Sequence, residues 1–398
     1  MDCSKIEQLN TEYSKKVASV SRKEKSGKKM SLVFSKIPFE FEKMPTDEEM
    51  VRDNLFGNNI GNMYFFNAVV KSLRCCDHEI IRYEDGMNID DYDSALLIQA
   101  NQIRNGTEEW YKNDYELLKK CHIPFVIVCV GSDSTPDFKM KLNDKEVEIM
   151  RKFYLEILSR TSSIGVRGEW TKKVMVEQLG LPEHQIDVIG CPSIRYFGNK
   201  MKLFPRNYPK FSKDIKIAVN FTAYHYDEDE AIFLNKLFKT YKNSYVIFTD
   251  KIEAEMLWKT QEPPIYRRHD LVPTVSNHFM VRQGRCRFVP VQENAMKMLE
   301  TFDFSIGSRI HQAIISILSG CPALLIAHSA RVLEIAEHNH IPYIMRSELI
   351  EEKPSIETLY YRACTGMIEF YKSYNSQLKE YTNFLEKNNL VVNPDFLM

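Results

Sequence analysis

Short apolar runs rich in β-prone residues alternate with longer helical patterns from about residue 31 onwards. In the first half the runs lie at residues 31–35, 95–99, 125–130, 164–167 and 187–189, and the helical patterns at 62–73, 111–120, 147–158 and 171–179. Helices that follow strands one by one are typical of βαβ units, whose neighbouring strands run parallel. The sequence therefore predicts an α/β fold built on a mostly parallel sheet.

The alternation breaks once and then restarts. Residues 192–214 contain Pro192, Pro205 and Pro209 among aromatic and basic residues, and we interpret them as a linker. Beyond it, strands are expected at 215–221, 245–249, 286–289, 302–306 and 323–327, helices at 229–241, 309–318 and 331–338, and one or two long helices over 355–387. Because 398 residues are too many for one ordinary core, two Rossmann-like domains are predicted.

The predicted organisation has five parts. They are a basic N-terminal segment (1–30), an N-terminal Rossmann-like domain for the acceptor (31–191), the linker (192–214), a C-terminal Rossmann-like domain for the donor (215–345), and C-terminal helices (346–398) able to pack back on the first domain. Ligands of open parallel sheets bind outside the carboxyl ends of the strands. The loops at those ends, facing a cleft between the domains, are therefore the expected site.

Composition and charge narrow the classes of function. The formal net charge is −1, which argues against a nucleic-acid partner. The nine cysteines include no Cys-x-x-Cys pair, and several lie in apolar runs, as expected of buried thiols in a reducing compartment. The longest apolar stretch, 313–327, is too short to span a bilayer, and the polar residues 1–29 lack a signal-peptide core. A cytoplasmic location is expected.

Residues 15–29 are strongly basic, with Glu24 alone opposing seven lysines and arginines. Such a segment can bind anionic lipid headgroups, which would give the protein a peripheral contact at the inner membrane. A solvated tail is the preferred interpretation, because the segment has little apolar face to insert.

The most specific local pattern is the turn Gly307-Ser308-Arg309-Ile310-His311, between a buried strand and a helix. Glycine permits a tight turn, and the helix N-terminus offers free N–H groups to an anion. Arginine adds a planar cationic fork, and histidine a proton near neutral pH. Alternatively, Arg309 caps a neighbouring carbonyl and His311 is a hydrogen-bonded core residue. The local pattern alone leaves both interpretations open.

Three segments, in chain order, resemble motifs of the polysaccharide pyruvyltransferase family. Residues 303–327 resemble its C-terminal motif, Gly-x-Arg-x-His followed by a small-residue helix, Gly-x-Pro and an apolar strand. Residues 163–171 and 187–193 resemble its Ser-x-Arg-(Asp/Glu)-x-x-(Ser/Thr) segment and the following Gly-x-Pro strand end. Residues 57–63 are similar to the Asn-x-Gly-Asp loop that opens the first family helix.

The chain departs from the family pattern at three places. Asn62 stands where the family usually has aspartate, and Gln99-Ala100-Asn101 replaces a glycine-rich turn. Both lie in the half expected to bind the acceptor, so they leave its identity open. Arg331 replaces the lysine of a Tyr-x-x-Lys motif and keeps the positive charge.

The resemblance implies a GT-B-like fold and transfer of a pyruvyl group from phosphoenolpyruvate to a sugar of a surface-polysaccharide precursor, as a cyclic ketal with release of phosphate. Phosphoenolpyruvate would be a co-substrate, and no other cofactor and no metal is expected. Its carboxylate and phosphate need at least two cationic contacts, which Arg167 and Arg309 would supply from the two domains. His311 would be the general acid. Ser308 and Arg331 complete the predicted donor site, although Arg167 could instead pair with Glu169, and Arg331 could be a surface residue.

Acceptor contacts are predicted in the N-terminal half. The candidates are Asn58, Asn62, Gln99, Asn101, Asp133 and Glu169. Asp133 or Glu169 could serve as the base for a sugar hydroxyl, although a turn-capping aspartate is the simpler interpretation of Asp133. The expected partner is a glycan or a lipid-linked oligosaccharide.

Two other functions fit the same fold. A GT-B glycosyltransferase could bind the diphosphate of a sugar nucleotide at the Gly307–His311 turn. A non-catalytic binding protein of a glycan pathway would tolerate the departures at Asn62 and Gln99.

Overall fold

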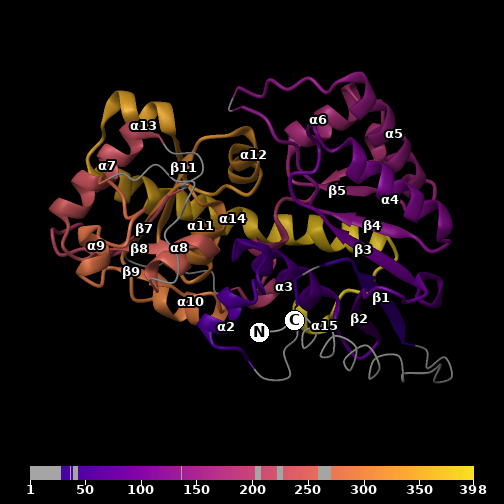
Figure 1. The fold of residues 1–398 in the computed structure, drawn as a ribbon, viewed down its shortest axis with the longest axis horizontal. Coiled ribbons are helices and arrows are strands. Elements are labelled where there is room, and N and C mark those ends of the chain that lie inside the picture. The colour runs from indigo at the N-terminus through magenta and orange to yellow at the C-terminus, as the bar shows by residue number, and fades with distance from the viewer. Residues whose placement is uncertain are drawn as a thin grey trace.

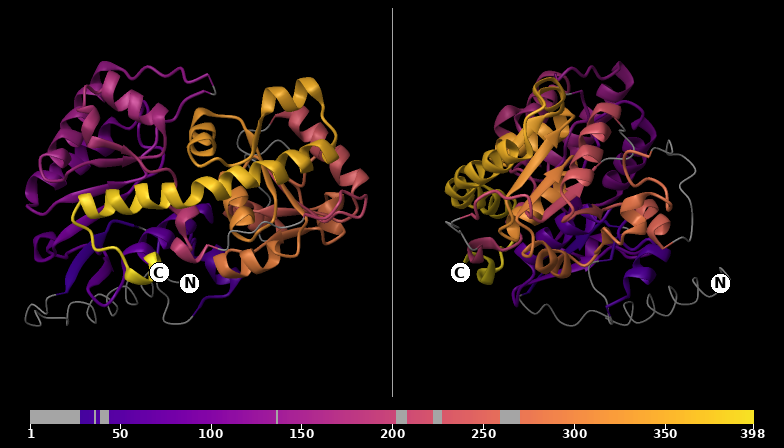
Figure 2. Two further views of the ribbon diagram at one scale, coloured as in Figure 1. Left: turned by 180° about the vertical axis from the view of Figure 1, so that it is seen from behind. Right: turned by 90° about the vertical axis from the view of Figure 1, so that its left-hand side faces the viewer.

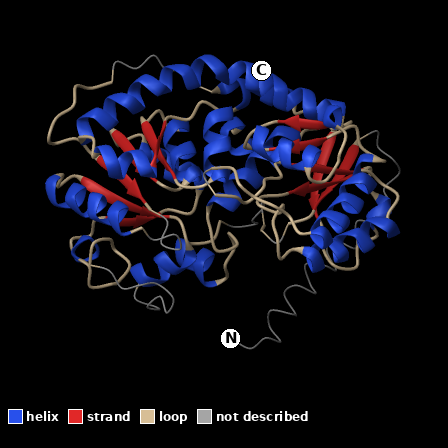
Figure 3. Cartoon of the chain, turned by 90° about the horizontal axis from the view of Figure 1, so that it is seen from above, coloured by secondary structure: helices blue, strands red, loops and turns tan. Residues whose placement is uncertain are grey.

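The computed structural model describes residues 28–35, 37–38, 44–135, 137–201, 208–221, 227–258 and 270–398. Two parallel sheets stand side by side with helices around each, and one long helix crosses behind both (Figures 1 and 3). Of the basic segment predicted for residues 1–30, residues 1–27 lie outside the described residues, while Lys29 and Met30 already belong to the first strand.

The first sheet has the order β2-β1-β3-β4, with all strands parallel. They are β1 (Lys29–Val33), β2 (His78–Arg82), β3 (Ser94–Ile98) and β4 (Phe125–Val128). The pair β5 (Ile164–Val166) and β6 (Ile186–Val188) continues the β4 edge, because Val130 forms a parallel bridge with Val166. The helices of this domain are α3 (Gly61–Leu73), η1 (Ile89–Asp91), α4 (Glu108–Lys120), α5 (Asp144–Leu158), α6 (Glu169–Glu177) and η2 (Glu183–Gln185).

The second sheet has the order β12-β11-β10-β7-β8-β9, again parallel throughout. In chain order these are β7 (Ile217–Asn220), β8 (Ser244–Phe248), β9 (Cys286–Phe288), β10 (Phe304–Gly307), β11 (Ala323–Ala327) and β12 (Tyr343–Met345). Around them lie α7 (Glu228–Thr240), α8 (Lys251–Leu257), α9 (Phe279–Arg282), α10 (Gln292–Leu299), α11 (Ile310–Leu318), α12 (Ala330–His338) and α13 (Arg346–Glu352). Counted within the domain the order is 3-2-1-4-5-6, the dinucleotide-binding Rossmann order, which reverses between β7 and β10.

The region predicted as a linker is partly helical and partly buried. It contains the short 3-10 helices η3 (Pro192–Arg195) and η4 (Gly198–Lys200), while residues 202–207 lie outside the described residues. Arg195 is fully buried, and its Nη2 donates to Asn339 Oδ1 and Gln377 Oε1, both at 2.8 Å. These bonds tie the region to the end of α12 and to the C-terminal helix.

The C-terminal helix α14 (Ile356–Lys387) spans both domains (Figure 2). Its 32 residues correspond to about 48 Å of helix, enough to cross two sheets. It packs on β11 of the second domain and reaches the first, where Lys387 Nζ lies 2.9 Å from Asp187 Oδ2 and Asn388 accepts the backbone N–H groups of Ser162 and Ser163. A short helix, α15 (Pro394–Leu397), packs against η4.

Part of the region 31–191, predicted as one domain, packs on the other domain instead. Helix α2 (Asp47–Arg52) lies beside α8 and α10 (Figure 1), and the Phe56 ring is 5.7 Å from the Phe288 ring. The loop before α3 bonds to the second domain as well, since Ile60 N donates to Thr249 O and Lys251 N to Asn58 O, both at 2.9 Å. The two domains are therefore interlocked. The sequence does not reveal this, because the amphipathic pattern of a helix does not show which domain covers its apolar face.

The predicted fold class, two Rossmann-like domains in a GT-B-like arrangement with a helical C-terminal extension, is confirmed by the two sheets and α14. Among the described residues, no helix is both long and apolar enough to cross a membrane.

Removing the Phe384 side chain should weaken the junction between α14 and the first domain. Its ring lies against Gly165, where an added Cβ would be 2.9 Å from Phe384 Cζ. Phe384→Ala should lower the free energy of unfolding by about 3–5 kcal/mol, because it leaves a cavity in a buried junction. Ile368→Ala, at an exposed position of the same helix, should change it by about 0.5 kcal/mol or less. Chemical denaturation of both variants measures the difference, and equal effects would contradict this account of the junction.

Candidate active site

The site begins at the point where the order of the second sheet reverses, between the carboxyl ends of β7 and β10. Asn220 and Gly307, the last residues of these strands, pair in register. An added Cβ at Gly307 would lie 2.0 Å from Asn220 O, so no larger residue fits without moving the strands apart. The glycine thus lets β10 approach β7 closely and turn directly into α11.

Arg309 is the N-cap residue of α11 and is held from several sides. Its backbone N donates to Asn220 Oδ1 at 2.8 Å and its Nε to Phe221 O at 3.1 Å, while Nη2 forms an ion pair with Asp250. The side chain therefore does bond a carbonyl, as the structural alternative proposed, and it also has a buried acid as a partner. These contacts fix the direction of the guanidinium before any ligand binds.

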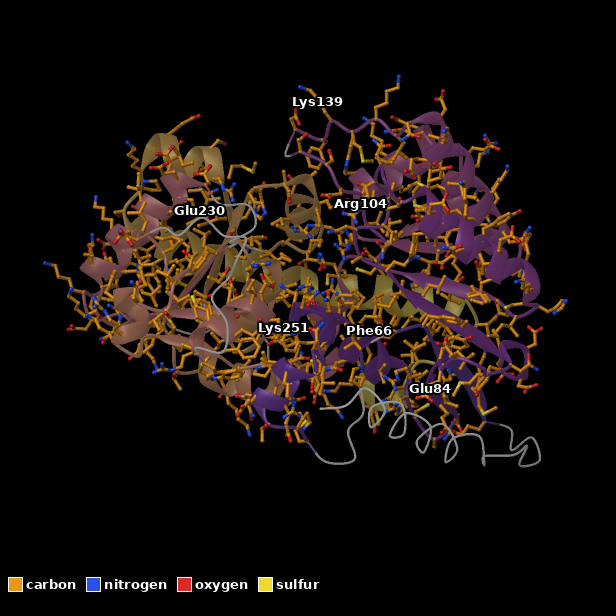
Figure 4. The ribbon with its side chains drawn as sticks, in the orientation of Figure 1. Phe66, Glu84, Arg104, Lys139, Glu230 and Lys251 are labelled. Carbon is orange, nitrogen blue, oxygen red and sulfur yellow. The ribbon has the colours of Figure 1, made fainter. Side chains whose placement is uncertain are left out.

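Asp250 joins Arg309 to the first domain. It follows β8, is 1% exposed, and also accepts a hydrogen bond from Asn59 Nδ2 of the loop before α3. Burial raises the pKa of the Asp250 carboxyl, and Arg309 and Asn59 oppose this rise. Lys251, labelled in Figure 4, lies at this junction of the two domains, since its backbone N donates to Asn58 O. The contact Asn59–Asp250–Arg309 is the first of two inter-domain contacts at the site.

Glu334 and Thr171 form the second inter-domain contact. Glu334 on α12 accepts Thr171 N at 3.0 Å and Thr171 Oγ1 at 2.8 Å. Helix α6 begins at Glu169, with Gly168 as its N-cap, so Thr171 lies within the first turn. An added Cβ at Gly168 would be 2.7 Å from Glu334 Cβ, which shows how closely the helices meet. Burial raises the pKa of Glu334 to about 7, opposed by its bonds to Thr171 and by Arg167.

Arg167 follows β5 and is 4% exposed. Its Nε donates to Cys129 O at 3.1 Å and its Nη1 to Asn101 Oδ1 at 2.7 Å. Gly131 packs on the side chain, since a Cβ there would lie 2.7 Å from Arg167 Cδ. Among the described residues no ion pair joins Arg167 to Glu169, which is exposed. The alternative structural partner predicted for Arg167 is therefore not the one that it has.

Arg331 lies in the first turn of α12, where the positive charges of Arg167 and Arg309 both act on it. Its Nε is buried and has no hydrogen-bond partner among the described residues. The pKa of Arg331 is lowered to about 10, mainly by burial and also by the charges of Arg167 and Arg309, while Asp133 opposes the change. Arginines from both domains thus act on one another at this site, and Arg331 has a buried Nε that no described residue uses.

His311, in the first turn of α11, faces α3 of the first domain. Its ring stacks on Phe65 at 5.9 Å, and its Nε2 is 3.9 Å from Cys191 Sγ. A Cβ at Gly61 would be 2.1 Å from His311 Nδ1, so the first residue of α3 must be glycine for the ring to fit. The ring is half-buried, with backbone on its Nδ1 side and sulfur on its Nε2 side.

The other predicted site residues differ in the domain that they belong to and in whether they have hydrogen-bond partners. The Ser308 hydroxyl bonds to Glu230 (Figure 4), whose Oε2 is 2.7 Å from Arg346 Nε, so this hydroxyl is engaged within the second domain. The remaining acceptor candidates lie in the first domain. Asn58 and Asn62 hold the loop before α3, Asn101 bonds Arg167, Asp133 and Glu169 are exposed, and Gln99 is buried with both amide atoms lacking a partner among the described residues.

The residues of the site that were not predicted include Asn59, Gly61, Thr171, Cys191, Asp250 and Glu334. Asn59, Gly61 and Cys191 belong to segments that resemble the family motifs, but the motifs do not say which side chains meet. Asp250 directly follows the predicted strand 245–249 and is the N-cap of α8, a common place for a capping acid. No group of three or more His, Cys, Asp or Glu within the described residues is arranged to hold a metal ion.

The fold and this site define a two-domain, GT-B-like protein with a cationic site between its domains. The chain belongs to the polysaccharide pyruvyl transferase family, whose model matches residues 59–330, and it is therefore a transferase. The matched region contains Arg167, Arg309 and His311. It also contains every residue of the two inter-domain contacts apart from Glu334.

Comparison with solved structures finds similar architectures at low identity. S. aureus MnaA with UDP is 12% identical with a TM-score of 0.46, over 90% of this chain and 98% of that one. The UDP-GlcNAc 2-epimerase from Neisseria meningitidis is 11% identical with a TM-score of 0.43, over 90% and 100%. The wall teichoic acid polymerase TagF is 11% identical with a TM-score of 0.44, over 92% and 89%. A search of curated proteins finds no match.

The Glu334 contact should make stability depend on pH. Because the pKa of Glu334 rises from 4.5 to about 7 on folding, the folded state binds more protons than the unfolded state between these values. Stability should therefore fall as pH rises from about 4.5 to about 7. Glu334→Gln, which mimics the protonated acid, should reduce this dependence and leave the share of Glu253, whose pKa burial also raises to about 7, whereas Glu337→Gln, exposed on the same helix, should keep it in full. Thermal melts across this range test the point, and parallel curves for wild type and Glu334→Gln would refute it.

Proposed function

We propose that this transferase moves a pyruvyl group from phosphoenolpyruvate to two hydroxyls of a sugar in a surface-polysaccharide precursor, forming a cyclic ketal and releasing phosphate. The observation that carries the proposal is the cluster Arg167, Arg309 and Arg331, drawn from both domains of a pyruvyl transferase family member. No cofactor other than phosphoenolpyruvate is proposed, and no metal.

The charges of the cluster suit a donor with two anionic groups. Arg309 already has Asp250 as a partner, and Arg167 bonds two neutral oxygens, so the cluster carries excess positive charge. Arg331 adds a buried donor that is not used by the described residues. A phosphate or carboxylate placed between them would gain charge-assisted hydrogen bonds and relieve the mutual repulsion.

The chemistry then needs an acid and a leaving-group site. A proton from His311 adds to the methylene carbon of phosphoenolpyruvate, and the neighbouring carbon is attacked by a sugar hydroxyl, whose proton passes to a base. Phosphate leaves as a second hydroxyl of the same sugar closes the ketal, and the arginines stabilise the departing charge. One phosphoenolpyruvate and one sugar diol thus give one ketal and one phosphate.

The acceptor side rests on fewer contacts. Asp133 is exposed and its charge acts on Arg331, so it lies beside the donor cluster and could accept the hydroxyl proton. Gln99 offers an unpartnered amide at the carboxyl end of β3, the edge at which ligands of parallel sheets bind. We propose that a glycan or lipid-linked oligosaccharide approaches from this side.

Arg331→Gln is the direct test of the donor cluster. It should weaken phosphoenolpyruvate binding about 10- to 100-fold, the effect of losing a hydrogen bond between charged groups. Arg331→Lys should fall between wild type and Arg331→Gln, because lysine keeps the charge and loses the planar fork. Calorimetry with phosphoenolpyruvate and assays of phosphate release and ketal mass on an acceptor panel provide the measurements.

Arg282→Gln, an exposed arginine of α9, is the matched control and should bind as wild type does. Binding of nucleotide sugars in place of phosphoenolpyruvate would favour a glycosyltransferase. No binding of either donor, together with a His311→Ala variant that keeps its biological function, would favour a non-catalytic role.

A further inference from the structure

Cys191 is a buried thiol next to the proposed general acid, and the reaction described above gives it no task. It lies three residues beyond the end of β6 and is 1% exposed. Its Sγ is 3.9 Å from His311 Nε2 and 3.0 Å from Ser193 Oγ. A thiol and an imidazole from different domains thus face each other beside the arginine cluster.

The charged and titratable groups that act on Cys191 come from five elements. They are Cys129 after β4, Arg167 after β5, Arg195 of η3, His311 of α11 and Tyr381 of α14. Both arginines and a protonated His311 favour a negative charge on the sulfur, whereas a tyrosinate at Tyr381 would oppose it. The pKa of the Tyr381 phenol is raised by burial, so at neutral pH this group is uncharged.

The pKa values of the two thiols of the site are shifted in opposite directions. The hydrogen bond from Cys129 lowers the pKa of the Cys191 thiol well below its usual value, and His311 and Arg167 act in the same direction against burial. Burial raises the pKa of Cys129. These opposite directions make Cys191 the member of the pair better suited to carry a negative charge, with Cys129 as its hydrogen-bond donor.

The geometry of the ring decides which nitrogen can serve the reaction. Nδ1 of His311 is closed off by the backbone of Gly61, where a Cβ would lie only 2.1 Å away, and Phe65 stacks on the ring face. Nε2 faces the Cys191 sulfur at 3.9 Å, which is a long hydrogen bond. A small rotation of the ring would break it and let Nε2 contact a substrate atom.

We propose that Cys191 is the positioning residue of His311: its thiolate holds the imidazole in place and keeps the proton on Nε2 until the donor takes it. This inference rests on the proposed function, in which His311 is the acid. The Nε2 proton passes to the methylene carbon of phosphoenolpyruvate and leaves a neutral imidazole beside the thiolate. The proton that the second sugar hydroxyl releases as it closes the ketal then restores the imidazolium, so the pair is unchanged after one turnover. The proton of the first hydroxyl passes by way of the base to the departing phosphate.

The kinetic test compares substitutions that remove or keep the negative charge. Cys191→Ser should move the alkaline limb of the kcat–pH profile to lower pH by about 1 unit or more, because an opposite charge at this distance no longer favours the imidazolium. Cys191→Asp, which keeps an anion, should return the limb towards wild type. The KM for phosphoenolpyruvate should change little in both, since neither removes an arginine. Cys286→Ser, a buried cysteine of β9, is the control and should leave the profile unchanged.

A second measurement does not depend on turnover. Thiolate absorbance in the ultraviolet, followed against pH as the difference between wild type and Cys191→Ser, should show a thiolate at neutral pH, and His311→Gln should reduce it. No thiolate at neutral pH, or a Cys191→Ser profile identical to that of wild type, would overturn the proposal. A His311-dependent thiolate in a protein that transfers no pyruvyl group would support the pair and refute only the proposed reaction.

Discussion

An arginine whose Nε is buried and unused is the constraint on which the site depends. Arg331 is half-buried, the charges of Arg167 and Arg309 act on it, and its buried Nε has no partner within the described part of the chain. Like charges repel, and the loss of water around the Nε adds a further cost. The domains nevertheless stay together, and Asn59–Asp250 and Thr171–Glu334 are two of the contacts that join them. The fold thus maintains a cationic site that an anionic donor stabilises.

The fold was predictable from the sequence because parallel strands buried on both faces form nearly continuous apolar runs. Strands β10 and β11 are fully buried and match their predicted ranges to within a few residues. Strands β2 and β12 gave no such signal, since β2 reads His-Glu-Ile-Ile-Arg and β12 has only three residues. Gly307 was recognised as a turn residue, and its closeness to Asn220 supplies the physical reason.

Contacts across the domains were not predictable in the same way. Asn59 and Asp250 are 191 residues apart, and hydrophobic periodicity carries no information about such a polar pair. The orientation of side chains was equally hidden: Ser308 stands in the motif beside Arg309, yet its hydroxyl bonds to Glu230 within the second domain. The position of α2 on the other domain is a further case, because its amphipathic pattern shows a buried face without showing what covers it.

The three arginines are held to different degrees, and this difference suits a reaction with a leaving group. Arg309 is fixed by Asp250 and Phe221 O, and Arg167 by Asn101 and Cys129 O, so both are oriented before the donor arrives. Preorganised donors cost no rearrangement as charge develops in the transition state. Arg331, in contrast, has an Nε that only a ligand or the residues beyond the described ones could use. The two fixed arginines are sufficient to bind a donor with one anionic group. The third arginine is therefore suited to a second anionic group, the phosphate that leaves in the reaction.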